Sequence, residues 1–109
     1  MRKEINKIGT IRYYNENNKL HREDGPAVEY AGGDKEWYKN GLLHREDGPA
    51  AEYASGGKRW FKNGRLHRED GPALEYANDD ECYYYNGICY PEIKTDEDWK
   101  RFIKLMVFQ

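Results

Sequence analysis

The chain has 109 residues, enough for one domain spanning 1–109, and its net charge of −2 mixes acidic and basic residues. This balance excludes the basic footprint of a nucleic-acid-binding protein, and no run of about 18 apolar residues would cross a membrane. Only 38% of the residues are hydrophobic but 15% are aromatic, which favours exposed sheets and binding surfaces over one deep core. The charged N-terminus has no apolar segment behind it, so we expect a cytoplasmic protein that contacts neither nucleic acid nor membrane.

The first part of the chain predicts an edge strand, at residues 5–11, followed by an exact repeat. The heptapeptide His-Arg-Glu-Asp-Gly-Pro-Ala occurs at 21–27, 44–50 and 67–73, always 23 residues apart. A fixed period of this length marks a repeat architecture, in which each unit buries its apolar face against its neighbours. We therefore expect the function to lie on a repeated surface and not in one catalytic cleft.

Alignment at this period extends the repeat over residues 11–90. One column holds Tyr14, Trp37, Trp60 and Tyr83, and another holds Asn17, Asn40, Asn63 and Asn86. A third column holds Tyr30, Tyr53 and Tyr76. The ends of the alignment degrade, as the capping units of repeat proteins do.

Each unit predicts a β-hairpin. A strand of alternating polarity, a Gly-Gly turn and a return strand cover residues 27–39. A two-residue turn would set Val28 opposite Trp37 and Glu29 opposite Glu36. Since like charges repel across strands, the register stays open by one residue, and such a slip exchanges the two faces of the sheet. The fold class is thus an all-β repeat, an elongated twisted antiparallel sheet of successive β-hairpins.

The Asn-Gly pairs predict a second tight turn in each unit. In the last unit, the turn at 86–87 would place Tyr84 opposite Cys89, with Cys82 diagonal to Cys89 on the same face. A diagonal separation of about 7–8 Å is long for a disulfide, so we expect two free thiols.

The C-terminal segment predicts a helix over residues 95–108. Thr95 is a typical N-cap and three acids follow it, which stabilises a helix start. Apolar residues then recur at helical spacing: Trp99, Phe102, Ile103, Met106 and Val107. We expect this helix to cap the open edge of the last hairpin. Docking of a partner by the helix is the alternative.

Candidates for chemistry are few. Each of the three histidines, His21, His44 and His67, has an Asp three residues later. Zinc sites gather three or four ligands in one place, so we interpret these residues as structural, with the Asp fixing the imidazole. A metal site and a partner contact are the alternatives. A catalytic carboxylate pair needs two different environments, which identical copies do not offer. We expect no enzyme, no metal and no cofactor.

The aromatic columns are the better candidates for function. They cannot all be buried in a single-layer sheet, and exposed Trp and Tyr beside Arg are typical of protein-binding hot spots. The candidate partner-binding residues are Tyr30, Tyr53, Tyr76, Trp37, Trp60, Tyr83, Arg45 and Arg68.

Residues 37–44, Trp-Tyr-Lys-Asn-Gly-Leu-Leu-His, followed by residues 51–58, Ala-Glu-Tyr-Ala-Ser-Gly-Gly-Lys, resemble a MORN repeat. The resemblance covers residues 11–90, and Arg-Glu-Asp-Gly-Pro-Ala stands where the usual unit has a shorter Gly-x-Gly. This variant is similar to repeats in small proteins of bacteriophages, mobile elements and giant viruses. The resemblance implies an elongated antiparallel sheet that binds and does not catalyse.

From these features we expect a non-enzymatic protein-binding module. With the phage-like resemblance, the expected partner is a host protein that this protein inhibits, as an anti-defence or anti-CRISPR factor does. The alternative is a self-assembling scaffold, in which open sheet edges pair between copies to give a homo-oligomer.

Overall fold

The computed structural model describes residues 1–107, which form fourteen short strands and one helix. The strands of the first half are β1 (Arg2–Ile5), β2 (Ile11–Tyr14), β3 (Val28–Glu29), β4 (Lys35–Glu36), β5 (Tyr38–Lys39), β6 (Leu42–Leu43) and β7 (Ala51–Glu52). The remaining elements are β8 (Lys58–Arg59), β9 (Phe61–Lys62), β10 (Arg65–Leu66), β11 (Leu74–Glu75), β12 (Glu81–Cys82), β13 (Tyr84–Tyr85), β14 (Ile88–Cys89) and α1 (Asp96–Val107).

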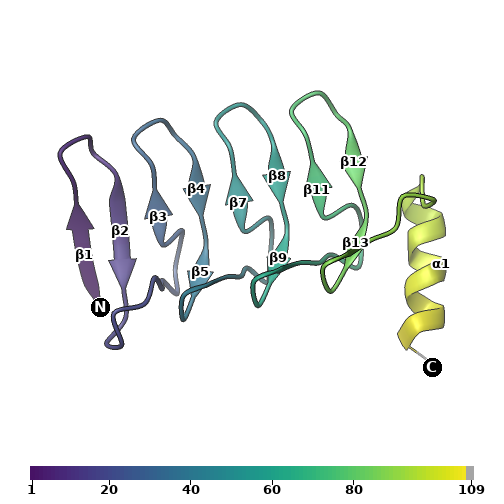
Figure 1. Cartoon of the computed structure of the whole chain (residues 1–109), viewed down its shortest axis with the longest axis horizontal. Coiled ribbons are helices and arrows are strands. Elements are labelled where there is room, and N and C mark those ends of the chain that lie inside the picture. Colours follow the sequence, from purple (N-terminus) through teal and green to yellow (C-terminus); the bar gives the residue numbers. More distant parts are fainter. Residues whose placement is uncertain (108–109) are drawn as a thin grey trace.

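The strands form a row of hairpins. Eight of them make one antiparallel sheet in the order β1-β2-β3-β4-β7-β8-β11-β12, and the others pair as β5-β6, β9-β10 and β13-β14. Figure 1 shows the large hairpins standing side by side, the small hairpins below them, and α1 at the C-terminal end. The molecule measures 46 × 32 × 19 Å. The predicted all-β hairpin repeat with one C-terminal helix is confirmed.

The predicted hairpin register was wrong by one residue. Val28 pairs with Glu36 and Glu29 pairs with Lys35. The turn contains three residues, because the N–H of Tyr30 donates to the carbonyl of Asp34 at 2.9 Å. Only its last residue, Gly33, has a positive φ, of 105°. A three-residue loop that ends in a left-handed glycine is a common hairpin connection.

The observed register has a physical reason in the cross-strand charges. In the sheet, Glu29 pairs with Lys35, Lys35 with Glu52, Glu52 with Lys58, and Lys58 with Glu75. This alternation replaces the predicted clash between two glutamates with opposite charges, which stabilise a sheet. At the last pair the alternation fails, since Glu75 pairs with Glu81.

The first unit is longer than the others by one turn residue. Its turn closes with the N–H of Asn15 on the carbonyl of Lys19 at 2.9 Å, whereas the later units have a two-residue Asn-Gly turn. The two columns that begin with Tyr14 and with Asn17 were therefore wrong at their first row. Tyr13 takes the tryptophan position, because its N–H donates to the carbonyl of Ala27, as that of Trp37 does to Ala50.

The N-terminal segment forms a hairpin and not the single strand predicted over residues 5–11. β1 pairs with β2, and the turn between them is closed by Asn6, whose side-chain oxygen accepts the N–H groups of Ile8 and Thr10 at 3.1 and 3.0 Å. Gly9 in this turn has a φ of 94°.

The helix α1 forms as predicted, with its start fixed by a cap. The N–H of Asp98 donates to Oγ1 of Thr95 at 3.1 Å. On the helix, Trp99 and Ile103 are buried and pack with Tyr83 into an aromatic core. The predicted last residue, 108, lies outside the described residues. No helix within residues 1–107 is long and apolar enough to cross a membrane.

The last hairpin places the cysteines as expected. Tyr84 pairs with Cys89, and both Cys82 and Cys89 are free thiols.

Candidate binding surfaces

The heptapeptide forms a connector between units, and its arginine makes most of the connector's side-chain contacts. We call the arginine and its contacts the hub. The Cζ atom of Arg45 lies 3.9 Å from the centre of the Trp37 ring. Its Nε donates to Asp47 at 3.1 Å, and its Nη1 donates to the carbonyl of Pro49 at 3.0 Å and to Glu52 at 3.1 Å. The Nε and Nη1 groups of Arg45 are thus bonded within the unit. The Arg45 side chain is 22% exposed.

The glycine of the heptapeptide leaves room for this guanidinium. A Cβ atom built on Gly48 would lie 3.0 Å from Cζ of Arg45, and one on Gly71 would lie 3.0 Å from Cζ of Arg68. The alanine that ends the motif is also constrained, since Ala50 is completely buried. Packing therefore accounts for the small residues of the heptapeptide, Gly48 beside the guanidinium and Ala50 in the core.

The histidines connect neighbouring units. Nδ1 of His44 accepts the backbone N–H of Asn63 at 3.0 Å, and Nε2 lies 2.7 Å from Oε1 of Glu46. Because Nδ1 accepts, the proton of the neutral ring is on Nε2 and points at Glu46. This bond holds the pKa of the Glu46 carboxyl below its ordinary value. The predicted partner of the imidazole, Asp47, was wrong, because Asp47 holds Arg45.

The same bonds recur in the other two connectors, with His21 on Asn40 and His67 on Asn86. Both ring nitrogens are therefore used by protein groups. Within residues 1–107, no three His, Cys, Asp or Glu side chains come together as a metal-binding group.

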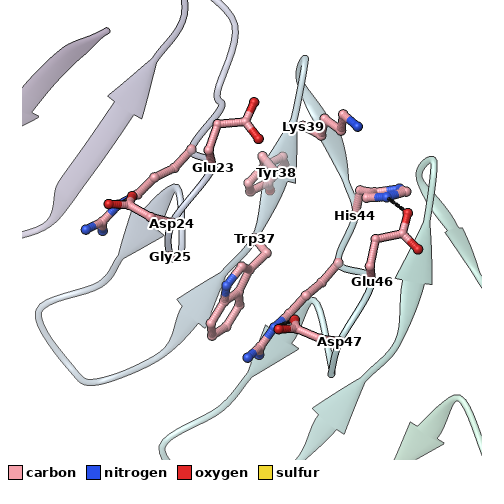
Figure 2. Close-up of a pocket in the computed structure, with 11 residues that line it drawn as sticks. Glu23, Asp24, Gly25, Trp37, Tyr38, Lys39, His44, Glu46 and Asp47 are labelled. Atoms are coloured by element: carbon pink, nitrogen blue, oxygen red, sulfur yellow. Dashed lines mark hydrogen bonds and ion pairs between the residues drawn. The ribbon is translucent and has the colours of Figure 1, made fainter.

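A groove lies between successive connectors. Its volume is about 600 Å³, and Figure 2 shows Trp37 within it, between Asp24 of one connector and Asp47 of the next. The carboxylates face solvent, with Asp24 86% and Asp47 87% exposed, while the arginines are held against the rings. We call this side of the molecule the connector face. It contains four of the predicted partner-binding residues: Trp37, Trp60, Arg45 and Arg68.

Strand alternation places the predicted tyrosines on the opposite side of the sheet. Tyr30 and Tyr76 are 37% and 46% exposed, and Tyr53 is half-buried. We call this side the tyrosine face. By strand alternation it consists of Tyr30, Tyr38, Tyr53, Phe61, Tyr76 and Tyr84, with the buried Val28, Ala51 and Leu74. Two of these rings, Tyr38 and Phe61, also line the grooves of the connector face.

Two tyrosines of this face share one carboxylate. The hydroxyls of Tyr30 and Tyr38 donate to Oε1 of Glu36 at 2.9 and 3.1 Å. Burial and this negative neighbour raise the pKa of both tyrosines, so they stay protonated donors at neutral pH.

A basic residue and a hollow complete the tyrosine face. Cζ of Arg59 lies 5.4 Å from the centre of the Tyr53 ring, and Arg59 makes no ion pair with any residue between 1 and 107. A hollow of about 280 Å³ lies between Tyr53 and Tyr76, lined also by Leu74 and by the charged residues Lys58, Arg59 and Glu75. The Glu75 carboxylate is already paired with Arg68 at 3.2 Å. An aromatic hollow beside an unpaired cation offers both apolar contact and charge to a ligand.

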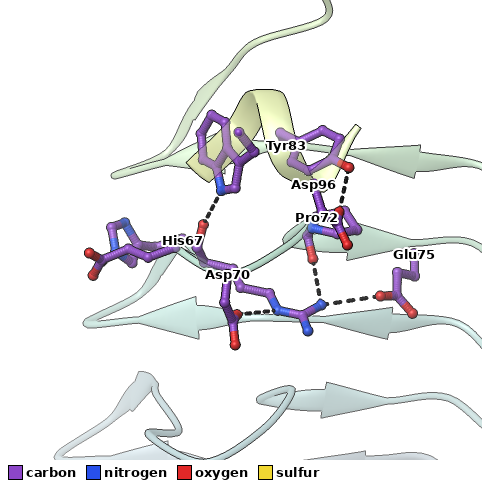
Figure 3. A network of polar contacts seen from close by, with 9 residues as sticks. His67, Asp70, Pro72, Glu75, Tyr83 and Asp96 are labelled. Carbon is purple, nitrogen blue, oxygen red and sulfur yellow. Dashed lines mark hydrogen bonds and ion pairs between the residues drawn. The ribbon is translucent and has the colours of Figure 1, made fainter. Parts of the chain in front are cut away.

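Tyr83 belongs to neither surface. It is 3% exposed, its ring centre lies 5.3 Å from that of Trp99, and its hydroxyl donates to Asp96 at 2.6 Å. Burial and this bond raise the pKa of Tyr83. Figure 3 shows the Tyr83 hydroxyl directed at Asp96. Trp99 also donates from Nε1 to the carbonyl of Arg68 at 2.8 Å. While α1 is docked, Tyr83 is a cap residue that no partner reaches.

No known protein family, curated protein or solved structure matches this chain. The two sides of this thin molecule differ: the connector face is held by internal ion pairs and rimmed by carboxylates, whereas the tyrosine face carries exposed rings and Arg59, which has no ion partner among residues 1–107.

Sequence reasoning found part of the tyrosine face. It identified Tyr30, Tyr53 and Tyr76, and the structure brings them to one side. It missed Tyr38, Phe61 and Arg59, because the register of the return strand was wrong by one residue. The signal was present in the Glu and Lys positions, which alternate across strands only in the observed register.

Proposed function

We propose that this protein binds another protein without catalysing a reaction, and that the tyrosine face is its binding surface. The observation that carries the proposal is the repeated exposure of matched rings, with Tyr30 37% and Tyr76 46% exposed. Aromatic residues and arginine are enriched where proteins bind one another, and Arg59 lies among these rings with no ion partner within residues 1–107.

The test is capture of a partner that depends on this face. The immobilised protein is exposed to lysate of the cell in which it acts, beside a variant with Tyr53→Leu and Tyr76→Leu. A control variant carries Lys39→Ala and Lys62→Ala on the connector face. We expect one stoichiometric partner with the wild type and the control, and its loss with the tyrosine variant. Equal capture by all three proteins would refute the role of the tyrosine face.

The MORN-like resemblance supports a narrower form of the proposal. The partner is then a host protein, met in the host cytoplasm, and the protein is an inhibitor of the anti-defence or anti-CRISPR type. The test is plating of a phage that a defence system restricts, on cells that express the wild type or the tyrosine variant. Rescue by the wild type alone supports inhibition; no rescue against any system the host carries contradicts it.

A role in partner contact stays a prediction for four residues: Trp37, Trp60, Arg45 and Arg68. They lie on the connector face, where their internal stacking and ion pairs compete with a partner. Single alanine variants at these positions are expected to lower the melting temperature before they alter partner capture.

A second candidate function is self-assembly, favoured by the edge strand β1. Its residues are all exposed, and Figure 1 shows no element beside its outer edge. Antiparallel pairing of two copies about Lys3 would place Arg2 opposite Glu4 of the second copy. Light scattering decides: a stable dimer that Lys3→Pro converts to monomer supports assembly, and a monomer at all concentrations contradicts it.

A further inference from the structure

The tyrosines of the tyrosine face have a spacing set by the repeat. Tyr30, Tyr53 and Tyr76 directly follow β3, β7 and β11, and one strand lies between each successive pair in the sheet. Because neighbouring strands lie about 4.8 Å apart, equivalent tyrosines lie about 9.6 Å apart. Figure 1 shows their hairpins in one row, so the rings form a ladder that runs across the strands.

Polyproline II is the regular peptide conformation that fits this ladder. It has three residues per turn and rises about 3.1 Å per residue, which gives a repeat of about 9.3 Å on one side. Over the two intervals between three tyrosines, the mismatch is only about 0.6 Å. The other regular conformations fit the ladder less well. One turn of an α-helix rises only about 5.4 Å, and in an extended strand two side chains three residues apart point to opposite sides.

The ladder also has the contacts that such a ligand needs. Aromatic-lined hollows accept proline rings, and the hollow between Tyr53 and Tyr76 has the buried Leu74 in its lining. The hydroxyl of Tyr30 is bonded to Glu36, while those of Tyr53 and Tyr76 make no side-chain hydrogen bond within residues 1–107. They are free to donate to the carbonyls of a polyproline II chain, which has no internal hydrogen bonds.

Charge distinguishes one end of the ladder from the other. Arg59 lines the Tyr53–Tyr76 hollow without an ion pair in the described part of the chain, so it complements an acidic ligand side chain. One unit earlier the matching position is Glu36, whose carboxylate already accepts two tyrosine hydroxyls.

From this geometry we infer that the tyrosine face binds a proline-rich segment in the polyproline II conformation. The segment has an apolar residue, ideally proline, at every third position and an acidic side chain beside the proline that occupies the Tyr53–Tyr76 hollow. The inference rests on the proposed function and adds the conformation and chemistry of the partner segment.

The test uses two synthetic peptides of equal composition and isothermal titration calorimetry. One is Pro-Glu-Ala repeated four times, and the other has its prolines regrouped so that no two are three residues apart. We expect the regular peptide to bind at least about tenfold more tightly. Equal affinity for the two peptides, or no binding of either, would overturn the inference.

Variants assign the contacts. Tyr76→Leu is expected to weaken the regular peptide about tenfold, and Lys62→Ala on the connector face to leave it unchanged. Arg59→Gln is expected to weaken Pro-Glu-Ala repeats but not Pro-Gln-Ala repeats. An unchanged affinity in Tyr76→Leu with a folded protein would place the peptide elsewhere and reject the ladder.

The two proposals fail differently. If a partner is captured through Tyr53 and Tyr76 but the regular peptide does not compete with it, protein binding stands and the polyproline inference falls. If capture does not depend on Tyr53 and Tyr76, the proposed function itself falls.

Discussion

At the scale of single residues, the connector shows how much a short sequence can specify. Arg45 contacts a ring, two carboxylates and a carbonyl, and each of these partners occupies a fixed place in or near the heptapeptide. Removing Glu52 leaves a part-buried guanidinium N–H without its partner, which costs more than the lost bond alone. The contacts of Arg45 thus account for the arginine, the aspartate and the proline carbonyl of the heptapeptide.

The glycine of the connector is expected to be intolerant of any side chain. Gly48→Ala places a Cβ 3.0 Å from Cζ of Arg45, so we expect a loss of about 1–3 kcal/mol in the free energy of unfolding. Gly32→Ala is the matched control, since nothing lies within 4 Å of its Cβ and its φ is not positive. Urea denaturation measures both. Equal stabilities would show that the arginine moves aside freely.

The His44–Glu46 bond gives stability a dependence on acidity. The folded pKa of Glu46 lies below its ordinary value of 4.5, so its contribution is complete above pH 4.5 and is lost as pH falls through the folded pKa. At pH 6.5 we expect the wild type to have a higher melting temperature than the Glu46→Gln variant. At pH 3.5 we expect this difference in melting temperature to be smaller. A difference that is independent of pH would contradict this assignment. Differential scanning calorimetry at both pH values measures it.

At the scale of the hairpin, cross-strand charge sets the register. The three-residue turn and the alternation of glutamate with lysine agree, and together they override the two-residue turn that the Gly-Gly pair suggests. The exception is the last pair, where Glu75 faces Glu81.

Glu81→Lys is expected to extend the alternation and stabilise the last hairpin by about 0.2–1 kcal/mol. Lys58→Glu is the opposite control: it puts four glutamates in one cross-strand row, at positions 52, 58, 75 and 81, and is expected to destabilise. Thermal unfolding at low and high salt measures both effects, which salt should diminish. A lower melting temperature for Glu81→Lys would show that the register does not depend on these charges.

The element scale also shows where sequence reasoning succeeds. Repeats, hairpins and the C-terminal helix follow from periodicity, because period and turn residues are local properties of the chain. The register and the extra turn residue of the first unit did not follow, because a one-residue difference leaves the local pattern almost unchanged. The connector hub was missed because its contacts reach from Arg45 back to Trp37 and forward to Glu52, and no local rule pairs them.

At the scale of the whole molecule, the C-terminal cap imitates one more unit. Arg68 stacks on Trp60, and the next ring of that column, Tyr83, is covered by Trp99 where another connector arginine would lie. Tyr90 likewise takes the backbone position of a connector histidine, since its N–H donates to the carbonyl of Tyr83 as that of His67 does to Trp60. The helix thus ends the row with a hydrophobic, largely aromatic interface in the place of an ion-paired arginine.

Removal of this cap is expected to loosen the C-terminal end first. Trp99→Ala deletes a fully buried indole, and we expect a loss of about 3–5 kcal/mol. Hydrogen exchange should show lost protection in β11–β14 before β1–β4, because each unit contacts only its neighbours. Leu105→Ala, at a position 69% exposed on the same helix, is the control and should be neutral. Uniform loss of protection along the chain would mean that the row unfolds as one cooperative block.

The identity of the connectors has a consequence for how such a protein can change over generations. Recombination between two copies of the heptapeptide would delete or duplicate one whole unit and rejoin the chain in frame, with both ends intact. Each event would shorten or lengthen the ladder by about 9.6 Å, the width of two strands, without disturbing the packing of the units that remain. The length of the tyrosine face, and with it the number of contacts to the proposed partner segment, would then depend on the number of units.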